Sequence, residues 1–195
     1  MRRGVHDMKE TDRSKNRTHI FIDTETTGLG PFANPRREDA IVEVGIAYRI
    51  NGRIERWGSL CNPGEKYFRN GRAEEALRVN QISLQDIADA PDSRTASMGL
   101  RSALKSIGEV ELHAYNIPFD KAFLDLEPWN ISMDFTWGED VMDLSFNYFQ
   151  LPQGYKIGLA RTLERLGIRP DGDPHRAATD AVSALMAYER MRDMK

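Results

Sequence analysis

The chain of 195 residues lacks several features that would assign it to a common class of protein. It has one cysteine, Cys61, so an intramolecular disulfide is excluded, and we expect a small core or edge side chain there. No apolar run has the length of a membrane span, and the start lacks the apolar core of a signal peptide. A net charge of -3 argues against a protein that coats nucleic acid through a basic surface. We therefore expect one cytoplasmic domain without membrane association.

Two acidic residues follow a short apolar run near the start of the chain. Asp23 and Glu25 come directly after Ile20-Phe21-Ile22, which has the composition of a strand. Because they are two residues apart, a strand would place both side chains on one face. Carboxylates at this density repel one another and raise each other's pKa unless a cation lies among them. The pattern indicates a site for Mg²⁺ or Mn²⁺, which favour oxygen ligands.

Three further candidates lie far along the chain. Asp120 closes the segment Asn116-Ile117-Pro118-Phe119-Asp120, and His175 precedes Asp180 by five residues. We expect Asp120 and Asp180 early in helices and His175 on the loop before the last helix. A lone histidine in such a place is most simply a surface residue. Its spacing to Asp180 and the other two segments favour a role at the metal site instead.

These three segments together resemble the motifs of the DEDD 3′→5′ exonuclease superfamily, also called DnaQ-like, in its histidine-containing branch. The superfamily includes the proofreading epsilon subunit of bacterial DNA polymerase III, RNase T and oligoribonuclease. The motifs are Asp23-Thr24-Glu25-Thr26-Thr27-Gly28-Leu29, Asn116 to Leu124, and His175 to Ala181. Their order and spacing are far more specific than one Asp-Thr-Glu. The resemblance covers the chain from about His19 onward.

The resemblance implies a role for each of the five residues. Two Mg²⁺ ions, for which Mn²⁺ can substitute, would stabilise the attacking and departing oxygens of an in-line displacement. Asp23 would bridge the ions, Glu25 and Asp180 would complete one of them, and Asp120 would act on the other through water. His175 would be the general base, since an imidazole titrates near neutral pH.

Further residues match positions that relatives use to hold the terminal nucleotide. The expected substrate-binding residues are Thr26 through its backbone N–H, Leu29 and Ile82 against the terminal base, and Asn116 through a hydrogen bond. Core packing of Leu29 and Ile82, and a turn or cap role for Asn116, are the plainer alternatives. We interpret Glu43 as structural and Asp143 as the cap of its helix.

Some positions depart from the family pattern without touching the metal ligands. Asn80 replaces the usual histidine, and Tyr115 stands where relatives often have one. The segment from Gly30 to Asp39 is long, and its Arg36 and Arg37 are candidates to contact the substrate backbone. These departures affect the expected substrate preference rather than catalysis.

The predicted elements fit the α/β, ribonuclease-H-like fold that the resemblance implies, with a mixed five-stranded sheet flanked by helices. Residues 1–17 are predicted to form a flexible tail and residues 18–195 the exonuclease domain. Asn51-Gly52 marks a hairpin, because both residues tolerate positive φ. Predicted strands are 18–23, 40–50, 53–60, 110–114 and a short one within 134–137. Predicted helices are 73–79, 94–107, 119 to before 128, 143–149, 157–166 and 177–191.

The leading interpretation is a metal-dependent 3′→5′ exonuclease that acts on single-stranded DNA and releases nucleoside 5′-monophosphates. The closest alternative is an exoribonuclease, since no residue type announces a preference for the sugar. A non-catalytic module that binds nucleic-acid ends or a polymerase is a third, and the retention of all five residues argues against it. Expected partners are single-stranded DNA or RNA 3′ ends. A homodimer is one possible assembly. A polymerase partner is possible but not indicated, because the chain stops after its last helix.

Overall fold

The structure is a computed structural model that describes residues 17–34, 36, 38–69 and 71–193. The predicted tail, residues 1–17, lies outside this range except for Arg17. The strands of the described domain are β1 (Thr18–Thr26), β2 (Ile41–Ile50), β3 (Arg53–Leu60), β4 (Val110–His113) and β5 (Thr136–Trp137). Its helices are η2 (Glu65–Phe68), α2 (Arg72–Asn80), α3 (Leu84–Ala88), α4 (Ser93–Ile107), α5 (Ile117–Leu124), η3 (Ile131–Met133), α6 (Val141–Tyr148), α7 (Leu159–Leu166) and α8 (Ala177–Asp193).

The five strands form one mixed sheet in the order β3-β2-β1-β4-β5. β1, β2 and β3 are antiparallel neighbours, whereas β4 runs parallel to β1 and β5 parallel to β4. Asn51 and Gly52 join β2 to β3 with φ values of 49° and 78°, as the hairpin prediction requires. The predicted α/β fold with a mixed five-stranded sheet is therefore confirmed.

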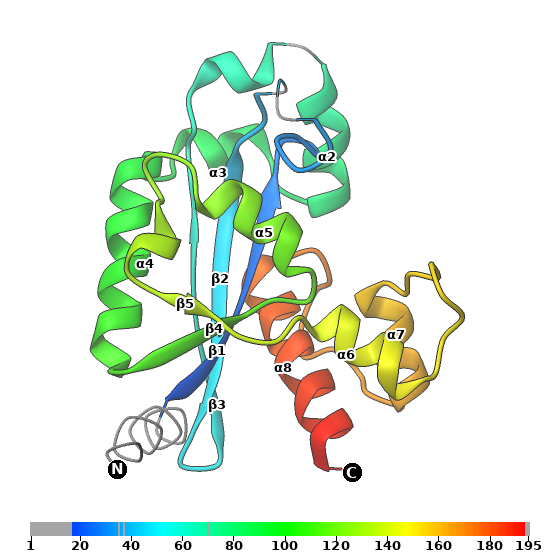
Figure 1. The fold of residues 1–195 in the computed structure, drawn as a ribbon. Helices are drawn as coiled ribbons and strands as arrows, with labels where there is room; N and C mark the ends of the chain where they lie inside the picture. The colour runs from blue at the N-terminus through cyan, green and yellow to red at the C-terminus, as the bar shows by residue number, and fades with distance from the viewer. Residues whose placement is uncertain (1–16, 35, 37, 70, 194–195) are drawn as a thin grey trace, which may run out of the picture.

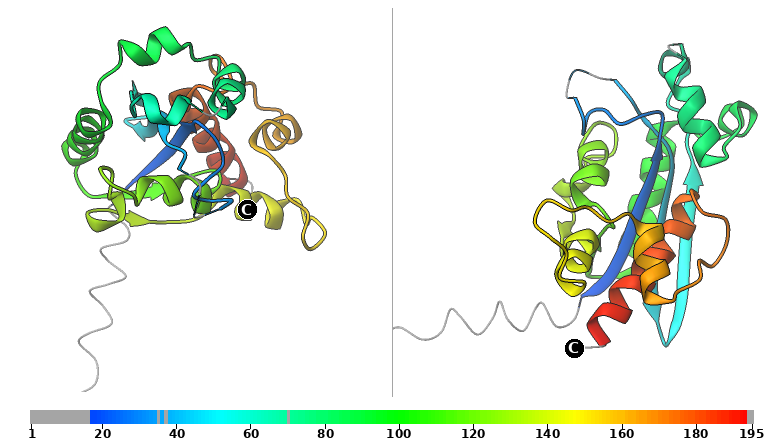
Figure 2. Two further views of the ribbon diagram at one scale, coloured as in Figure 1. Left: turned by 90° about the horizontal axis from the view of Figure 1, so that it is seen from above. Right: turned by 90° about the vertical axis from the view of Figure 1, so that its right-hand side faces the viewer.

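Helices cover both faces of the sheet, and alternation along β1 decides which residues meet which layer. Ile20 and Ile22 pack with α4 and α5 on one face, and Phe21 packs with α6, α7 and α8 on the other. Figure 1 shows α4 and α8 on opposite sides of the strands, and the end view in Figure 2 shows β1 between α5 and α8. No helix in the described part of the chain is long and apolar enough to cross a membrane.

A glycine brings α8 close to the sheet. An added Cβ at Gly45 of β2 would lie 2.2 Å from the backbone nitrogen of Ala178, a distance that no side chain can occupy. The first turn of α8 therefore rests directly on β2, at the residue that pairs with Asp23 across the β1–β2 ladder. This contact fixes the position of the helix that carries Asp180.

Local hydrogen bonding corrects two details of the prediction. The cap of α6 is Asp140, not Asp143, because a capping carboxylate accepts from the N–H three residues later, here that of Asp143 at 3.0 Å. The other Asp140 oxygen accepts from the N–H of Ile117 at 2.7 Å, so one side chain serves the starts of α5 and α6. The short helix α3 was not predicted; Ser83 and Asp86 form a capping box that begins it.

Candidate active site

The end of β1 presents two carboxylates to the α8 side of the sheet. Asp23 and Glu25 follow Phe21 at two-residue spacing, and their ladder partners on β2 are Gly45 and Glu43. The exposed fraction of Glu25 is 9%, although it carries a charged group. The strand thus holds both acids next to the helix that approaches at Gly45.

Asp120 reaches the same end of β1 from α5. It lies in the first turn of that helix, is buried, and accepts a hydrogen bond at 2.9 Å from the hydroxyl of Thr24. Burial is the largest contribution to its pKa, which is raised to about 7 despite hydrogen bonds from Thr24 that lower it. Thr24, which sequence reasoning missed, ties this acid to the strand that carries the other two.

α8 and the loop before it bring the last two candidates, Asp180 and His175, to Glu25. Ligand atoms of Glu25, His175 and Asp180 all lie within 4.8 Å of one another. His175 is exposed and has a left-handed backbone with φ of 59°, and its N–H donates to Asp180 Oδ2 at 3.2 Å. A non-glycine residue held in this conformation is strained, which is a feature of functional loops. The structure therefore collects the predicted histidine and its partner acids at one point.

The electrostatics of this cluster fit a divalent cation. Burial, followed by repulsion from Asp120, Glu25 and Asp180, raises the pKa of Asp23 well above its ordinary value. Burial and the charge of Asp180 raise the pKa of Glu25 to about 8, and burial also raises that of Asp180. A bound cation would stabilise the deprotonated carboxylates and so lower these raised pKa values. An all-carboxylate donor set with one imidazole nearby suits Mg²⁺ or Mn²⁺.

An ion pair between a buried glutamate and a partly exposed arginine anchors the loop that carries the histidine. Glu43 is 5% exposed and accepts from Arg176 Nε at 3.1 and 3.2 Å and from Nη2 at 2.9 Å. It also accepts from the backbone N–H of Ala177 at 3.2 Å. Glu43 is thus structural, as expected, and its task is to hold the first residues of α8 against β2. Arg176 was missed, and its position directly after His175 was the available signal.

A hollow of about 500 Å³ opens beside Glu25. Its lining includes Thr26, Leu29, Val79 and Phe119, with Asn80 and Glu75 at the α2 side. Leu29 is 59% exposed, so it is not a core residue. The hollow therefore has an apolar wall made by loop, helix and strand, next to the acids.

Two of the expected substrate residues do not line this hollow. Ile82 is buried in a separate core cluster with Val42, Leu77 and Ile87, and Val79 of the preceding helix faces the hollow in its place. Asn116 stands at the N-cap position of α5 without a side-chain cap bond, and Asp140 takes the role of capping group. In both cases a nearby residue, Val79 of α2 or Phe119 of α5, lines the hollow instead.

The long loop before β2 is pinned at its base. Asp39 is 6% exposed and accepts from the N–H of Gly30 at 3.0 Å, and an added Cβ at Gly28 would lie 2.6 Å from the same carboxylate. Arg36 is exposed on this loop, and Arg37 lies outside the described residues. The anchored base keeps Leu29 at the mouth of the hollow.

Comparisons with known proteins agree with this geometry. The family described as RNase_T exonuclease matches residues 20–188. A DNA polymerase III subunit epsilon-like protein of Rhodobacter capsulatus is 32% identical over 97% of this chain and 26% of its own length. The DNA polymerase III subunit epsilon of Haemophilus influenzae is 28% identical over 76% of this chain and 57% of its own length. The chain thus spans about a quarter to rather more than half of these relatives.

Solved structures share the fold at low sequence identity. The nuclease domain of 3'hExo, a DEDDh family member bound to rAMP, has a TM-score of 0.69 at 17% identity, over 91% of this chain and 92% of that one. E. coli Exonuclease I in complex with a dT13 oligonucleotide has a TM-score of 0.64 at 18% identity, over 92% and 42%. S. pombe Pop2p, in a form with Mg²⁺ and Mn²⁺ bound, has a TM-score of 0.67 at 14% identity, over 95% and 88%. With the family match over most of its length, this chain belongs to the RNase T exonuclease family, within the DEDD 3′→5′ exonuclease superfamily.

Proposed function

We propose that residues 18–195 form a 3′→5′ exonuclease domain that hydrolyses the terminal phosphodiester bond of single-stranded DNA and releases nucleoside 5′-monophosphates. The observation that carries this proposal is the convergence of Glu25, His175 and Asp180 within 4.8 Å, beside the partly buried Asp23 and the buried Asp120. DNA is favoured because the relatives above are DNA polymerase III epsilon proteins. A polymerase as partner of this chain stays outside the proposal.

The carboxylates are the proposed ligands of two Mg²⁺ ions, for which Mn²⁺ can substitute. Asp23 would contact both ions, Glu25 and Asp180 one of them, and Asp120 the other. When bound, the ions supply charge for the attacking and departing oxygens of an in-line displacement. The raised pKa values of Asp23, Glu25 and Asp120 are what a cation would lower, which supports this assignment.

His175 is the proposed general base. Its exposed imidazole stands at the edge of the acid cluster, where an unprotonated ring nitrogen can take the proton of the attacking water. The backbone bond to Asp180 and the Glu43–Arg176 ion pair hold the loop while the side chain stays free to turn. The protein thus fixes the backbone of the base and leaves its ring mobile.

The hollow beside Glu25 is the proposed site of the terminal nucleotide. Leu29 and Val79 offer apolar contacts for a base, and Phe119 offers a ring for stacking. The backbone N–H of Thr26 is the proposed donor to the terminal 3′-OH. Neither Ile82 nor Asn116 lines the hollow, so the contacts expected of them with the terminal nucleotide are not part of this proposal.

Digestion of matched single-stranded DNA and RNA oligonucleotides with Mg²⁺ tests the proposal. A 5′ label should give a ladder that shortens from the 3′ end, and a 3′ label should appear at once as a mononucleotide. A ladder on RNA alone would move the assignment to an exoribonuclease, and internal cuts or no cuts would refute it. Glu55→Gln, an exposed glutamate on β3, is the control that should cut like the wild type.

A further inference from the structure

A second cluster of potential metal ligands lies near the start of β1, away from the acids. His19 Nδ1 is 2.8 Å from His113 Nε2, and Glu111 Oε2 is 3.6 Å from the first nitrogen and 3.4 Å from the second. Two imidazoles and one carboxylate therefore converge on a common point. Neither the catalytic proposal nor the exonuclease motifs use any of the three.

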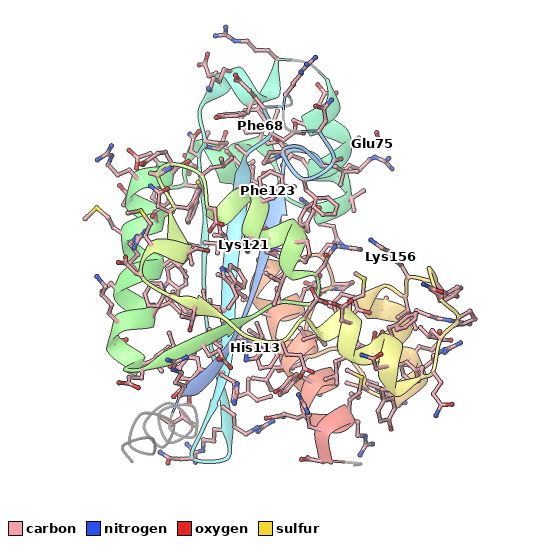
Figure 3. The ribbon with its side chains drawn as sticks, viewed as in Figure 1. Phe68, Glu75, His113, Lys121, Phe123 and Lys156 are labelled. Atoms are coloured by element: carbon pink, nitrogen blue, oxygen red, sulfur yellow. The ribbon has the colours of Figure 1, made fainter. Side chains whose placement is uncertain are left out.

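The β1–β4 ladder makes this arrangement rigid. His19 pairs with Glu111 in the parallel register, and Glu111 and His113 leave the same face of β4 because they are two residues apart. His19, Phe21 and Asp23 also share a face of β1, so His19 lies roughly 13 Å along the strand from Asp23. Figure 3 labels His113, which lies where β4 passes α8. The cluster is a separate place on the face that also carries the acids.

The distances match the size of a transition metal. A triangle with these three sides has a point about 2 Å from every corner, and Zn²⁺ binds imidazole nitrogen and carboxylate oxygen at about 2.0–2.2 Å. The set of two histidines and one glutamate is a known three-ligand arrangement for zinc. Mg²⁺ avoids such nitrogen ligands, so the two clusters call for different metals.

His113 is prepared to act as a ligand. It is 1% exposed, and burial lowers its pKa, which favours the neutral form that binds metal. Its Nδ1 lies 3.0 Å from the carbonyl oxygen of Glu139, and in the tautomer with an unprotonated Nδ1 the backbone N–H of Glu139 donates to this nitrogen, also at 3.0 Å. With the proton on Nδ1, the ring donates to this carbonyl and leaves the Nε2 lone pair directed at the cluster. Gly138 makes the approach possible, since an added Cβ would lie 2.4 Å from the His113 ring.

The guanidinium group of Arg17 contacts the edge of this cluster and not its centre. Arg17 Nη1 lies 3.8 Å from Glu111 Oε1, the carboxylate oxygen that faces away from the histidines, and it also donates to Thr136 at 3.3 Å. The rings of Phe21 and Tyr188 pack against His113. The side chain of His19 is 48% exposed, which leaves a path for an ion to enter.

We propose that His19, Glu111 and His113 bind one Zn²⁺ ion, which fastens β1 to β4 beneath α8 and leaves one coordination position open to solvent. The site is independent of the catalytic ions in ligand type and in position. The proposed ion joins two strands of the sheet and lies roughly 13 Å along β1 from Asp23, so we expect it to act on stability rather than on the chemistry of cleavage.

Calorimetric titration with Zn²⁺ tests the proposal, in excess Mg²⁺ and in a Glu25→Gln, His175→Ala chain that lacks two of the three potential zinc ligands Glu25, His175 and Asp180 of the catalytic cluster. One ion per chain should bind, and the melting temperature should rise by about 5 °C or more at a hundredfold excess over Kd. Adding His19→Gln or Glu111→Gln should weaken binding at least tenfold. Both side chains are partly exposed, so these variants should fold.

Two results would overturn the proposal. One is the absence of a zinc-binding step in the parent chain, which would leave the cluster as hydrogen-bonded histidines. The other is equal zinc affinity in the parent chain and in both ligand variants, which would place the ion elsewhere. His6→Ala leaves all three proposed ligands in place and is the control that should bind zinc like the parent chain.

Discussion

Replacing Glu25 by glutamine should stabilise the metal-free protein at alkaline pH. The folded state raises the pKa of Glu25 from 4.5 to about 8. Between these two values the folded chain binds more protons than the unfolded chain, so stability falls as pH rises. The wild type should therefore lose stability from about pH 4.5 to pH 8, and Glu25→Gln should lack this contribution.

The size of the effect follows from the shift. One pKa unit corresponds to about 1.36 kcal/mol, so the full change from 4.5 to about 8 is worth at most about 5 kcal/mol. Between pH 5.5 and 8.5 the free energy of unfolding should fall by at most about 3 kcal/mol because of this group. For a domain of this size that equals up to roughly 6–12 °C in melting temperature. Loss of the Glu25 charge also relieves Asp23, which acts in the same direction.

Thermal unfolding in EDTA at pH 5.5 and pH 8.5 measures this difference. The advantage of Glu25→Gln over the wild type should grow between the two pH values, whereas Glu55→Gln on β3 should follow the wild type. If the melting temperatures of the wild type and of Glu25→Gln fall equally between the two pH values, the reasoning is refuted, because ionisation of Glu25 then does not destabilise the fold.

Other parts of the site make further predictions. His175→Ala should lower turnover by about 10² while single-strand binding and stabilisation by Mg²⁺ persist, as competition binding and melting curves can show. Glu43→Gln breaks the ion pair that holds the α8 start and should lower kcat about tenfold with little change in KM, measured on a labelled oligonucleotide. Gly45→Ala should cost about 3 kcal/mol or more in urea unfolding, because its Cβ would meet backbone at 2.2 Å, whereas the nearest atom to an added Cβ at Gly58 is 3.3 Å away, so Gly58→Ala should cost less.

Local signals in the sequence were sufficient for the sheet and for the main segments of the site. The apolar run before Asp23, the Asn51-Gly52 hairpin and the Gly108 and Gly167 helix ends depend on neighbours in sequence, and the structure has elements at these places. Spacing of two residues was enough to place Asp23 and Glu25 on one face.

Contacts between distant segments were beyond the same reasoning. Glu43 and Arg176 are separated by 133 residues, and the neighbourhood of Arg176 to His175 marks its segment but does not predict its pairing with Glu43. Asp140 was overlooked because its two acceptor bonds serve helices on both sides of β5. Ile82 was expected at the substrate because the family resemblance places it against the terminal base with Leu29, yet the chain turns at Gln81, with φ of 55°, and Ile82 packs in the core. These contacts depend on tertiary packing, which the periodicity of the sequence does not predict.

The most direct test of the central claim compares the wild type with Asp23→Asn on a 5′-labelled single-stranded oligonucleotide. Asparagine keeps the size of the side chain and removes one charge from the cluster, so the fold should persist and melting without metal should be unchanged or higher. The account predicts a ladder from the 3′ end for the wild type with Mg²⁺, none with EDTA, and none for Asp23→Asn. A ladder of similar rate from Asp23→Asn, or from the wild type in EDTA, would contradict it.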